Sequence, residues 1–429
     1  MALPRKPLFW VVTLGHLTID LFNGSIPVLV TFLAAHLIPM SNTEIGLAVS
    51  AYQLTGALSQ PFAGWLADRN GGRWLGAGGL AWTVSLLCLT LVIAATTRSY
   101  ALTVIPMVLA AAGSGAFHPV GTMHAADCER TPATGRLSIF FFAGQTGGGL
   151  GPAITGFLLD RAATHNEIFV SAFPAFSGLI TERAVITPLI AAGLIALPAV
   201  LLMGIIIPSA AHHASTHTER QISRKAEHQR VGRTAIIILI AVIGLRSFVN
   251  PGSVSFLPRL FQSRGWSPTE YGLIASAYWI GGGITGIFFG YLADRYGSRL
   301  LIALSMLLSA PAVFGLSLFD GAPAFLMALA TGAFSGGSHS LLVGMAHRIM
   351  PAGKGLASGA TLGMIFGAGA LGVLIIGSVS DRIGLISVFQ MIAGITVLTG
   401  FIALLLPDDR PQRQPEPLAE GAPAYSSGD

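Results

Sequence analysis

Charged side chains are scarce in this sequence of 429 residues, since Asp, Glu, Lys and Arg together make up only 10% of it. A soluble globular domain carries about 25% charged residues. Hydrophobic residues make up 52% of the chain, and its mean hydropathy is +0.70. These proportions exclude an ordinary soluble domain and predict a protein that crosses a membrane several times.

Cysteines are few, and the motifs of soluble enzymes are missing from the sequence. Cys88 lies in an apolar run and Cys128 in a polar break, so we expect no disulfide. A Gly-x-Gly-x-x-Gly pattern at 367–372 lies inside an apolar run rather than after a strand, and there is no Walker loop, nucleophile elbow or zinc-protease helix. The sequence therefore predicts no enzymatic activity, no cofactor and no bound metal.

Long apolar runs recur along the chain, and each is near the roughly 20 residues that a helix needs to span a bilayer. The runs are too long for the strands of a transmembrane barrel. Together they predict an all-α membrane protein with twelve transmembrane helices. The expected spans are 8–37, 44–67, 74–96, 101–126, 136–162, 184–208, 233–262, 268–292, 300–319, 321–350, 355–380 and 384–407.

Lys and Arg residues are unevenly divided between the two sides of the predicted bundle. If the N-terminus is cytoplasmic, cytoplasmic segments hold 17 of the 24 basic residues. The opposite topology would invert this bias, so we expect both termini in the cytoplasm and the helices in a bacterial inner membrane. The same bias, with the shortage of acids, accounts for a pI near 9.5, so we expect membrane lipid but no nucleic acid as a partner.

The most informative feature that is present is an internal repeat. Between residues 43–73 and their counterparts at 269–299, 16 of 31 positions are identical. Both segments end in a charged turn, Asp68-Arg69 in the first and Asp294-Arg295 in the second. A duplicated membrane unit is typical of transporters, which form their binding site between two halves.

The repeat sets the expected domain organisation. We expect two pseudo-symmetric six-helix bundles, at 1–208 and 233–407, joined by a cytoplasmic linker at 209–232 and followed by a disordered tail at 408–429. Further Asp-Arg turns at 160–161 and 381–382 divide each half into two three-helix units. Because three crossings reverse the direction of the chain, successive units must be inverted.

The doubled Gly-x-Leu-Ala-Asp-Arg-x-Gly-x-Arg turn resembles the signature loop of the major facilitator superfamily, and this likeness extends over nearly the whole chain. The fifth predicted helix resembles the antiporter motif of that superfamily at Gly147, Gly151, Pro152 and Gly156. A narrower likeness to the fosmidomycin-resistance branch rests on three short segments. They are His16-Leu-x-x-Asp20, Phe117-His118-Pro119 and Leu356-Ala357-Ser358-Gly359; Val120 stands where that branch usually has an acid.

Ionisable side chains inside the bilayer cost several kcal/mol unless they face a cavity or a partner. The few here are Asp20 near the middle of the first helix, His118 in the fourth, Arg246 in the seventh and His339 in the tenth. Each of these helices begins a three-helix unit. The superfamily resemblance implies that these four helices line the central cavity.

Asp20 and His16 are four residues apart and share one helix face. A buried carboxylate beside a cation can exchange protons, so we expect this pair to couple transport to protons. The alternative is a permanent structural pair with a His or Arg. Arg246 presents a charged planar fork that suits an anionic group of the substrate, and its alternative role is an ion pair with Asp20.

The remaining candidate substrate-binding residues are polar side chains at similar depth, which could equally serve packing. They are His118, His339, Asn250, Gln53, Tyr278 and Gln145. The charged turns, in contrast, are expected to form a conformational latch at the cytoplasmic ends of the helices, where an acid can bind a helix N-terminus. The latch residues are Asp68, Arg69, Arg73, Asp294, Arg295 and Arg299; the alternative is that they only set topology.

Together these features predict a monomeric secondary transporter that works by alternating access. The favoured activity is proton-coupled antiport that exports a small polar or anionic toxic compound. Uptake of an organic acid or sugar with protons stays open, because a fold does not fix the direction of transport. A non-transporting membrane receptor would need a sizeable soluble domain or a long signalling tail, and the sequence predicts neither.

Overall fold

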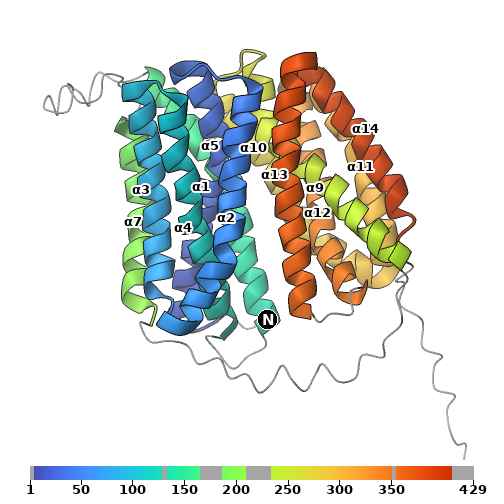
Figure 1. Cartoon of the computed structure of the whole chain (residues 1–429), viewed down its shortest axis with the longest axis horizontal. Helices are drawn as coiled ribbons and strands as arrows, with labels where there is room; N and C mark the ends of the chain where they lie inside the picture. Colours follow the sequence, from blue (N-terminus) through green and yellow to red (C-terminus); the bar gives the residue numbers. More distant parts are fainter. Residues whose placement is uncertain (1–3, 128–132, 165–185, 209–232, 350–353, 408–429) are drawn as a thin grey trace, which may run out of the picture.

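The computed structural model describes residues 4–127, 133–164, 186–208, 233–349 and 354–407, and these form twelve α-helices (Figure 1). A π-helical turn, η1 (Leu33–Leu37), extends the first helix. The predicted all-α membrane fold is confirmed. The helices are α1 (Pro7–Phe32), α2 (Asn42–Asn70), α3 (Arg73–Thr97), α4 (Tyr100–Asp127), α5 (Ala133–Thr164), α7 (Ile186–Ile206), α9 (Arg233–Gln262), α10 (Pro268–Tyr296), α11 (Ser298–Leu318), α12 (Gly321–Ile349), α13 (Lys354–Ile383) and α14 (Leu385–Ala403).

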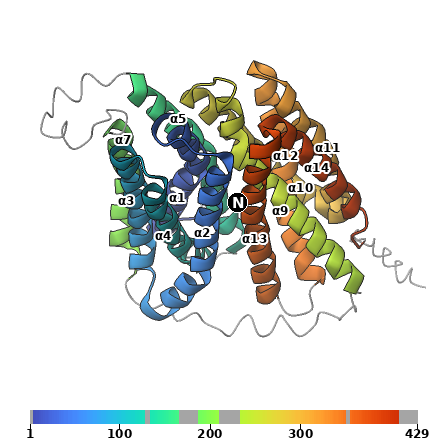
Figure 2. The ribbon, with the colours of Figure 1, turned by 45° about the horizontal axis from the view of Figure 1, so that its top comes forward.

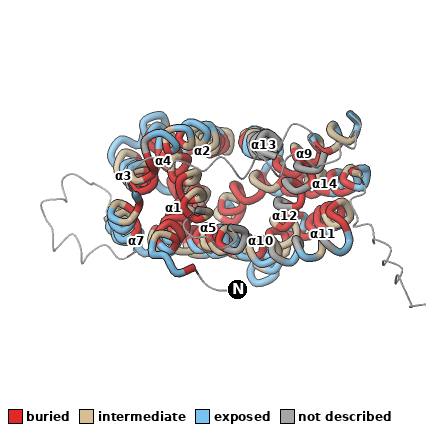
Figure 3. Tube along the Cα trace, turned by 90° about the horizontal axis from the view of Figure 1, so that it is seen from below, coloured by how far each residue is buried: buried red, intermediate tan, exposed pale blue. Residues whose placement is uncertain are grey.

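The helices form two groups that lie side by side, α1 to α7 in one and α9 to α14 in the other (Figures 1 and 3). The main contacts between the groups are those of α5 with α10 and of α2 with α13, and the latter pair lies side by side in Figure 2. The linker at 209–232 and the tail at 408–429 lie outside the described residues, so the domain boundaries stay a prediction.

Within the described residues, eight helices are long and apolar enough to cross a membrane by length and composition alone. The other four are α2, α5, α10 and α12, which the sequence also predicts as spans. Their glycines, polar side chains and charged ends lower their hydropathy. Three of them, α2, α5 and α10, contact the other half, so part of their surface faces protein rather than lipid.

The repeat is visible in the way that α2 and α10 begin and end. Each starts with a capping box, in which Ser41 or Ser267 accepts from the backbone of the Glu three residues later, and that Glu accepts from the serine's own backbone. Each ends at a glycine with positive φ, Gly71 at 79° and Gly297 at 82°. This conformation favours glycine, so the Asp-Arg-x-Gly turn stops both helices at the same place.

Glycines on α5 allow it to pack closely against both halves. A Cβ atom at Gly147 or Gly151 would overlap the backbone carbonyls of Leu17 and Leu21 on α1. A Cβ atom at Gly156 would overlap the Pro268 carbonyl at the start of α10. The glycines of the antiporter-like motif therefore hold α5 between α1 of its own half and α10 of the other half.

The two halves are joined where α2 begins and α13 ends. The carboxylate of Asp381 accepts hydrogen bonds from the backbone of Asn42 (2.8 Å) and from the backbone (2.8 Å) and hydroxyl (2.6 Å) of Thr43. An acid is favourable here because the N-terminus of α2 has free N–H groups and a positive dipole end. At the pseudo-symmetric position, the Thr269 hydroxyl on α10 donates to the carboxylate of Asp160 on α5 (2.6 Å).

Deeper in the same two interfaces, a second pair of repeat-related residues joins the halves. Ser50 on α2 donates to the Ala370 carbonyl on α13 (2.6 Å), and Ser276 on α10 accepts from the Ala153 backbone on α5 (2.9 Å). Each interface therefore has a carboxylate contact at its end and a serine contact further in. Both interfaces are joined from the same end of the bundle.

We expect Asp381→Asn to weaken the closure of this end. The amide keeps one acceptor oxygen, but its NH2 group faces the N–H donors of α2. We expect this replacement to destabilise the closed state by about 1–2 kcal/mol, which shifts the open-to-closed ratio roughly fivefold to thirtyfold. Distances between spin labels on α2 and α13 would measure the shift. Asp320→Asn is the matched control, because Asp320 pairs with Arg264 inside the same half (3.3 Å). An unchanged distance distribution in Asp381→Asn would mean that the Asp381 contact does not hold this end closed.

Candidate functional site

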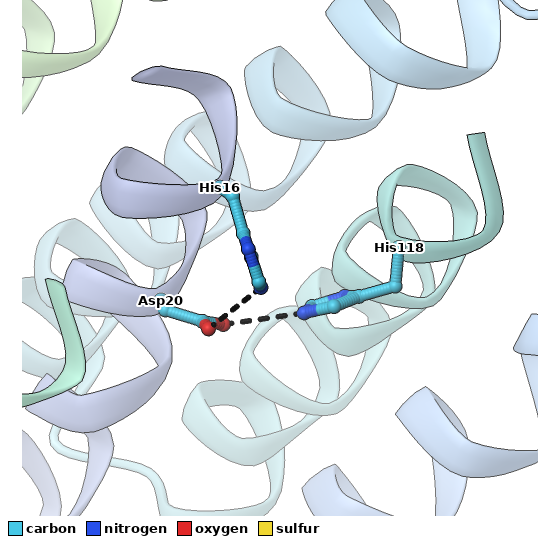
Figure 4. Close-up of side chains that lie close together, drawn as sticks. All are labelled: His16, Asp20 and His118. Atoms are coloured by element: carbon cyan, nitrogen blue, oxygen red, sulfur yellow. Dashed lines mark hydrogen bonds and ion pairs between the residues drawn. The ribbon is translucent and has the colours of Figure 1, made fainter. Parts of the chain in front are cut away.

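Two ionisable residues predicted to couple protons, Asp20 and His16, lie one turn apart on α1 and face His118 on α4 (Figure 4). The Nε2 atom of His16 is 3.1 Å from Oδ2 of Asp20, and the Nε2 atom of His118 is 3.2 Å from Oδ1. His16 is buried, whereas the side chains of Asp20 and His118 are 24% and 25% exposed. The sequence-based candidates therefore form one cluster that is accessible on the side of Asp20 and His118.

The neighbouring helix α5 leaves room for this cluster and holds His16 in place. The imidazole of His16 stacks on the Phe140 ring, with centroids 4.0 Å apart, and its Nδ1 donates to the Phe140 carbonyl (2.8 Å). A Cβ atom at Gly144 would lie only 2.7 Å from the carboxylate of Asp20. A glycine at this position of α5 therefore lets the His16–Asp20 pair fit between the helices.

Backbone carbonyls fix which nitrogen of each histidine carries a proton. Nδ1 of His118 donates to the Ser114 carbonyl (2.7 Å), as Nδ1 of His16 does to Phe140. A carbonyl can only accept, so each Nδ1 must be protonated and each Nε2 must face a carboxylate oxygen of Asp20. Each of these two contacts is a hydrogen bond only when a proton lies between its atoms. The cluster can therefore hold two exchangeable protons.

Further polar groups on α1 and α4, and one on α2, support the carboxylate. Nδ2 of Asn23 donates to Oδ1 of Asp20 (3.0 Å) and to the hydroxyl of Ser114 (2.9 Å). The hydroxyl of Tyr52 on α2 donates to Oδ1 of Asn23 (2.7 Å). Asn23, Tyr52 and Ser114 are not among the residues predicted from the sequence, although Asn23 and Tyr52 have counterparts in the predicted residues Asn250 and Tyr278 of the second half.

The second half carries the matching arrangement around Arg246. The guanidinium is 4% exposed, and it donates to the Ser335 carbonyl (2.9 Å) and the Ser338 hydroxyl (3.2 Å) on α12. The hydroxyl of Tyr278 on α10 donates to Oδ1 of Asn250 (2.5 Å) and lies 3.2 Å from the hydroxyl of Ser335. The structure thus brings together Arg246, Asn250 and Tyr278.

An ion pair between Arg246 and Asp20 is the alternative role that the sequence leaves open for Arg246. In the part of the chain that the structure describes, Asp20 pairs instead with the two histidines and Asn23. The charged groups of the two halves are therefore held separately, each by side chains of its own half.

The other candidate substrate-binding residues are less constrained. Gln53 is half-buried on α2 and Gln145 is exposed on α5, and neither has a hydrogen-bond partner among the described side chains. His339 lies on α12, but its side chain is outside the described residues. These three stay predictions.

The residues of the predicted latch lie at the opposite end of the bundle from Asp381. Asp68 and Arg69 are exposed at the end of α2, and the guanidinium of Arg69 lies 4.2 Å from the Trp65 ring centroid. Arg73 donates to the Ile207 carbonyl within its own half (2.7 Å). Arg295 lies over the Tyr296 ring (5.4 Å) and Arg299 near the start of α11, whereas the side chain of Asp294 is not among those described.

Capping of a helix N-terminus by an acid is observed for Asp381 at the start of α2, and the latch roles expected of Asp68 and Asp294 stay predictions. Asp160 belongs to the second Asp-Arg turn of the sequence and Asp381 to the fourth. The repeat could have identified them, because each of the four turns lies at the end of the second helix of a three-helix unit.

His16, Asp20 and His118 also have the residue types of a metal site, with one ligand atom of each within 4.8 Å of the others in the described chain. Those atoms already contact one another in the hydrogen-bonding arrangement above. The chemistry that the geometry supports directly is the sharing of protons between two imidazoles and one carboxylate.

Comparison with known proteins agrees with the sequence resemblance. The family model described as Major Facilitator Superfamily matches residues 8–258 and 235–427. An uncharacterized MFS-type transporter of Bacillus subtilis (strain 168), YfnC, is 25% identical over 414 residues, covering 95% of this chain and 94% of the relative. The fosmidomycin resistance protein of Escherichia coli (strain K12) is 24% identical over 409 residues, covering 93% and 92%.

Solved structures of similar fold have lower identity. A bacterial homologue of the human lysosomal transporter Spinster, in an inward-facing and unoccupied conformation, has a TM-score of 0.70 at 17% identity, covering 94% of this chain and 98% of that one. The inward-open xylose transporter XylE from E. coli has a TM-score of 0.68 at 15% identity, covering 94% and 97%. At these identities the likeness concerns the fold alone.

Proposed function

Because the chain belongs to the major facilitator superfamily, we propose that it is a proton-coupled antiporter that exports a small polar or anionic toxic compound by alternating access. The single observation that carries this proposal is the His16–Asp20–His118 cluster, which can hold two exchangeable protons and in which the side chains of Asp20 and His118 are partly exposed. The buried cation Arg246 lies on α9, the helix that corresponds to α1 in the other half.

Antiport requires that protons and substrate compete for the same protein state. When the two protons leave, the cluster presents a carboxylate and two Nε2 lone pairs, which are acceptors for substrate hydroxyl or amide groups. A substrate with donor groups at one end therefore displaces protons, while an anionic group at its other end is attracted by Arg246. Export of such a compound also agrees with the name of the E. coli relative, a fosmidomycin resistance protein.

The two cross-half interfaces suit the rocking motion of alternating access. With both termini in the cytoplasm, as the Lys and Arg distribution predicts, the Asp381 and Asp160 contacts lie on the periplasmic side. Closure of that side corresponds to a cytoplasm-facing state, in which an exporter takes up its substrate. The inner membrane of a bacterium is the location that this orientation implies.

The second candidate is uptake of an organic acid with protons. Two protons give the cluster one net positive charge, and Arg246 adds a second. An anion without donor groups would bind more tightly to this proton-loaded state, so protons and substrate would then move together. The donor groups of the substrate therefore decide between the two directions of coupling.

Proteoliposomes loaded with acidic buffer distinguish these candidates. Addition of fosmidomycin, or of a compound that an overexpressing strain resists, should release protons and acidify the external medium if the protein is an antiporter. Alkalinisation of the medium would support symport instead. If no external pH change accompanied uptake of any such compound, proton coupling itself would be refuted.

A further inference from the structure

The two halves carry the same polar triad, and only one copy has a carboxylate. Tyr52, Asn23 and Ser114 form the triad of the first half, and Tyr278, Asn250 and Ser335 form that of the second. The tyrosines are related by the sequence repeat, and in both triads the tyrosine hydroxyl donates to the amide oxygen of the asparagine. The two copies can therefore be compared atom by atom.

The copies differ in what the amide nitrogen of the asparagine binds. In the first half, Nδ2 of Asn23 donates to the carboxylate of Asp20 and to Ser114. In the second half, Nδ2 of Asn250 has no acceptor among the described residues. Asn250 is half-buried, so this donor is partly accessible. The second triad therefore keeps a hydrogen-bond donor available where the first triad has used it.

The charge next to each triad also differs. Asp20 precedes Asn23 on α1, whereas Arg246 stands one turn before Asn250 on α9 and shares its helix face. The acids in the helices of the second half lie near helix ends, at Glu270, Asp294 and Asp381. The interior of this half thus combines a cation with an amide donor and has no carboxylate in the middle of any helix.

The positions of Arg246 and Asn250 are fixed through a common neighbour. Arg246 donates to the carbonyl of Ser335, and Tyr278 contacts both the hydroxyl of Ser335 and the amide oxygen of Asn250. These contacts hold the guanidinium and the amide beside the same turn of α12. Cationic and neutral N–H donors that converge in this way are the groups that bind a carboxylate or phosphonate.

We propose that Asn250 and Arg246 bind an oxyanion of the substrate, a carboxylate or a phosphonate, at the position where the first half holds its own carboxylate, Asp20. The inference deepens the proposed function and rests on it, because it assigns the substrate class of the same transport site. Asn250 is then a specificity-determining residue, since its amide donor selects an acceptor over a neutral or cationic group.

The test is equilibrium binding of three probes to the full-length protein in lipid nanodiscs: fosmidomycin, which is a phosphonate, benzoate, and benzamide as the neutral isostere of benzoate. In the wild type, benzoate should displace fosmidomycin and benzamide should not. Asn250→Asp keeps the acceptor for Tyr278 but replaces the donor with a negative charge, so we expect both anions to bind at least about tenfold more weakly. Asn250→Gln keeps the donor and should lose less affinity.

Three results would overturn the proposal. They are anion affinities within about twofold of wild type in a folded Asn250→Asp protein, no binding of either anion to the wild type, and equal displacement by benzoate and benzamide. Displacement of fosmidomycin from the wild type by benzoate and not by benzamide tests the preference for an oxyanion even if the variants do not fold. Proton uptake by the solubilised protein after a pH jump separately reports the His16–Asp20–His118 cluster, so a wild-type protein that binds neither anion but still takes up protons refutes this inference and not the coupling site.

Discussion

Asp20→Asn is expected to abolish substrate accumulation driven by a pH gradient. Each pH unit contributes about 1.4 kcal/mol per coupled proton, so a gradient of two units can drive roughly 100-fold accumulation for one proton and the square of this for two. Without the carboxylate, neither imidazole has an anionic partner to hold its second proton. Accumulation in the variant should therefore fall to the ratio of about 1 that an uncoupled carrier reaches.

The measurement is radiolabelled substrate uptake into proteoliposomes with an imposed gradient. Counterflow exchange without a gradient is the control, because it needs substrate binding and rocking but no net proton movement. We expect Asp20→Asn to retain exchange while losing accumulation. Persistent pH-driven accumulation in this variant would remove Asp20 from the coupling mechanism.

The tautomer argument adds a smaller prediction for the histidines. His118→Gln keeps a polar side chain of similar reach but cannot take up a proton, so only the contact between His16 and Asp20 can still exchange one. If each contact carries a proton, the protons moved per substrate should fall from about two to one. The ratio of proton flux to substrate flux, measured in the same vesicles, would show whether it does; an unchanged ratio would mean that His118 holds no transported proton.

Much of the fold could be predicted because the local sequence of each helix indicates where the helix lies and where it ends. Apolar runs, the Asp-Arg-x-Gly turns and the Ser-x-x-Glu caps are local signals, and the structure has helices in all twelve predicted spans. Composition alone is weaker for α2, α5, α10 and α12, since these helices are partly surrounded by protein. For α2 and α10 the internal repeat supports the prediction independently of hydropathy.

The candidate site could be predicted only where a residue is unusual for its surroundings. Asp20 and Arg246 stand out because charge is costly in a bilayer, but Asn23, Tyr52 and Ser114 are unremarkable in composition. Their role depends on which helix faces which, and one sequence does not encode this explicitly. The repeat offers an indirect route, since naming Tyr278 as a candidate should have drawn attention to Tyr52.

The contacts between the halves could not be predicted for the same reason, because they depend on which helices face each other. Capping of a helix N-terminus by an acid is the chemistry that the sequence predicts for Asp68 and Asp294, and the structure shows it for Asp381. Which end of the bundle is joined depends on the conformation, because rocking opens one end as it closes the other. All four turns share the Asp-Arg pair, so this pair alone does not show which of them joins the halves.

Arg246→Gln is expected to raise the apparent KM for an anionic substrate by about 10- to 100-fold, because a hydrogen bond to a charged group contributes about 1.5–3 kcal/mol. Arg246→Lys is the informative comparison. It keeps the positive charge but loses the planar fork that donates to Ser335 and Ser338 at once, so its KM should lie between those of Gln and the wild type.

The pair of variants separates charge from geometry. If attraction of the anion is what matters, Lys recovers most of the affinity, and the deficit of Gln shrinks for a neutral substrate analogue. If the fork mainly fixes α9 against α12, both variants lose thermal stability, and their KM values for charged and neutral compounds rise together. An apparent KM unchanged in Arg246→Gln would place Arg246 outside the substrate site, because no other side chain could replace a full positive charge at that depth without cost.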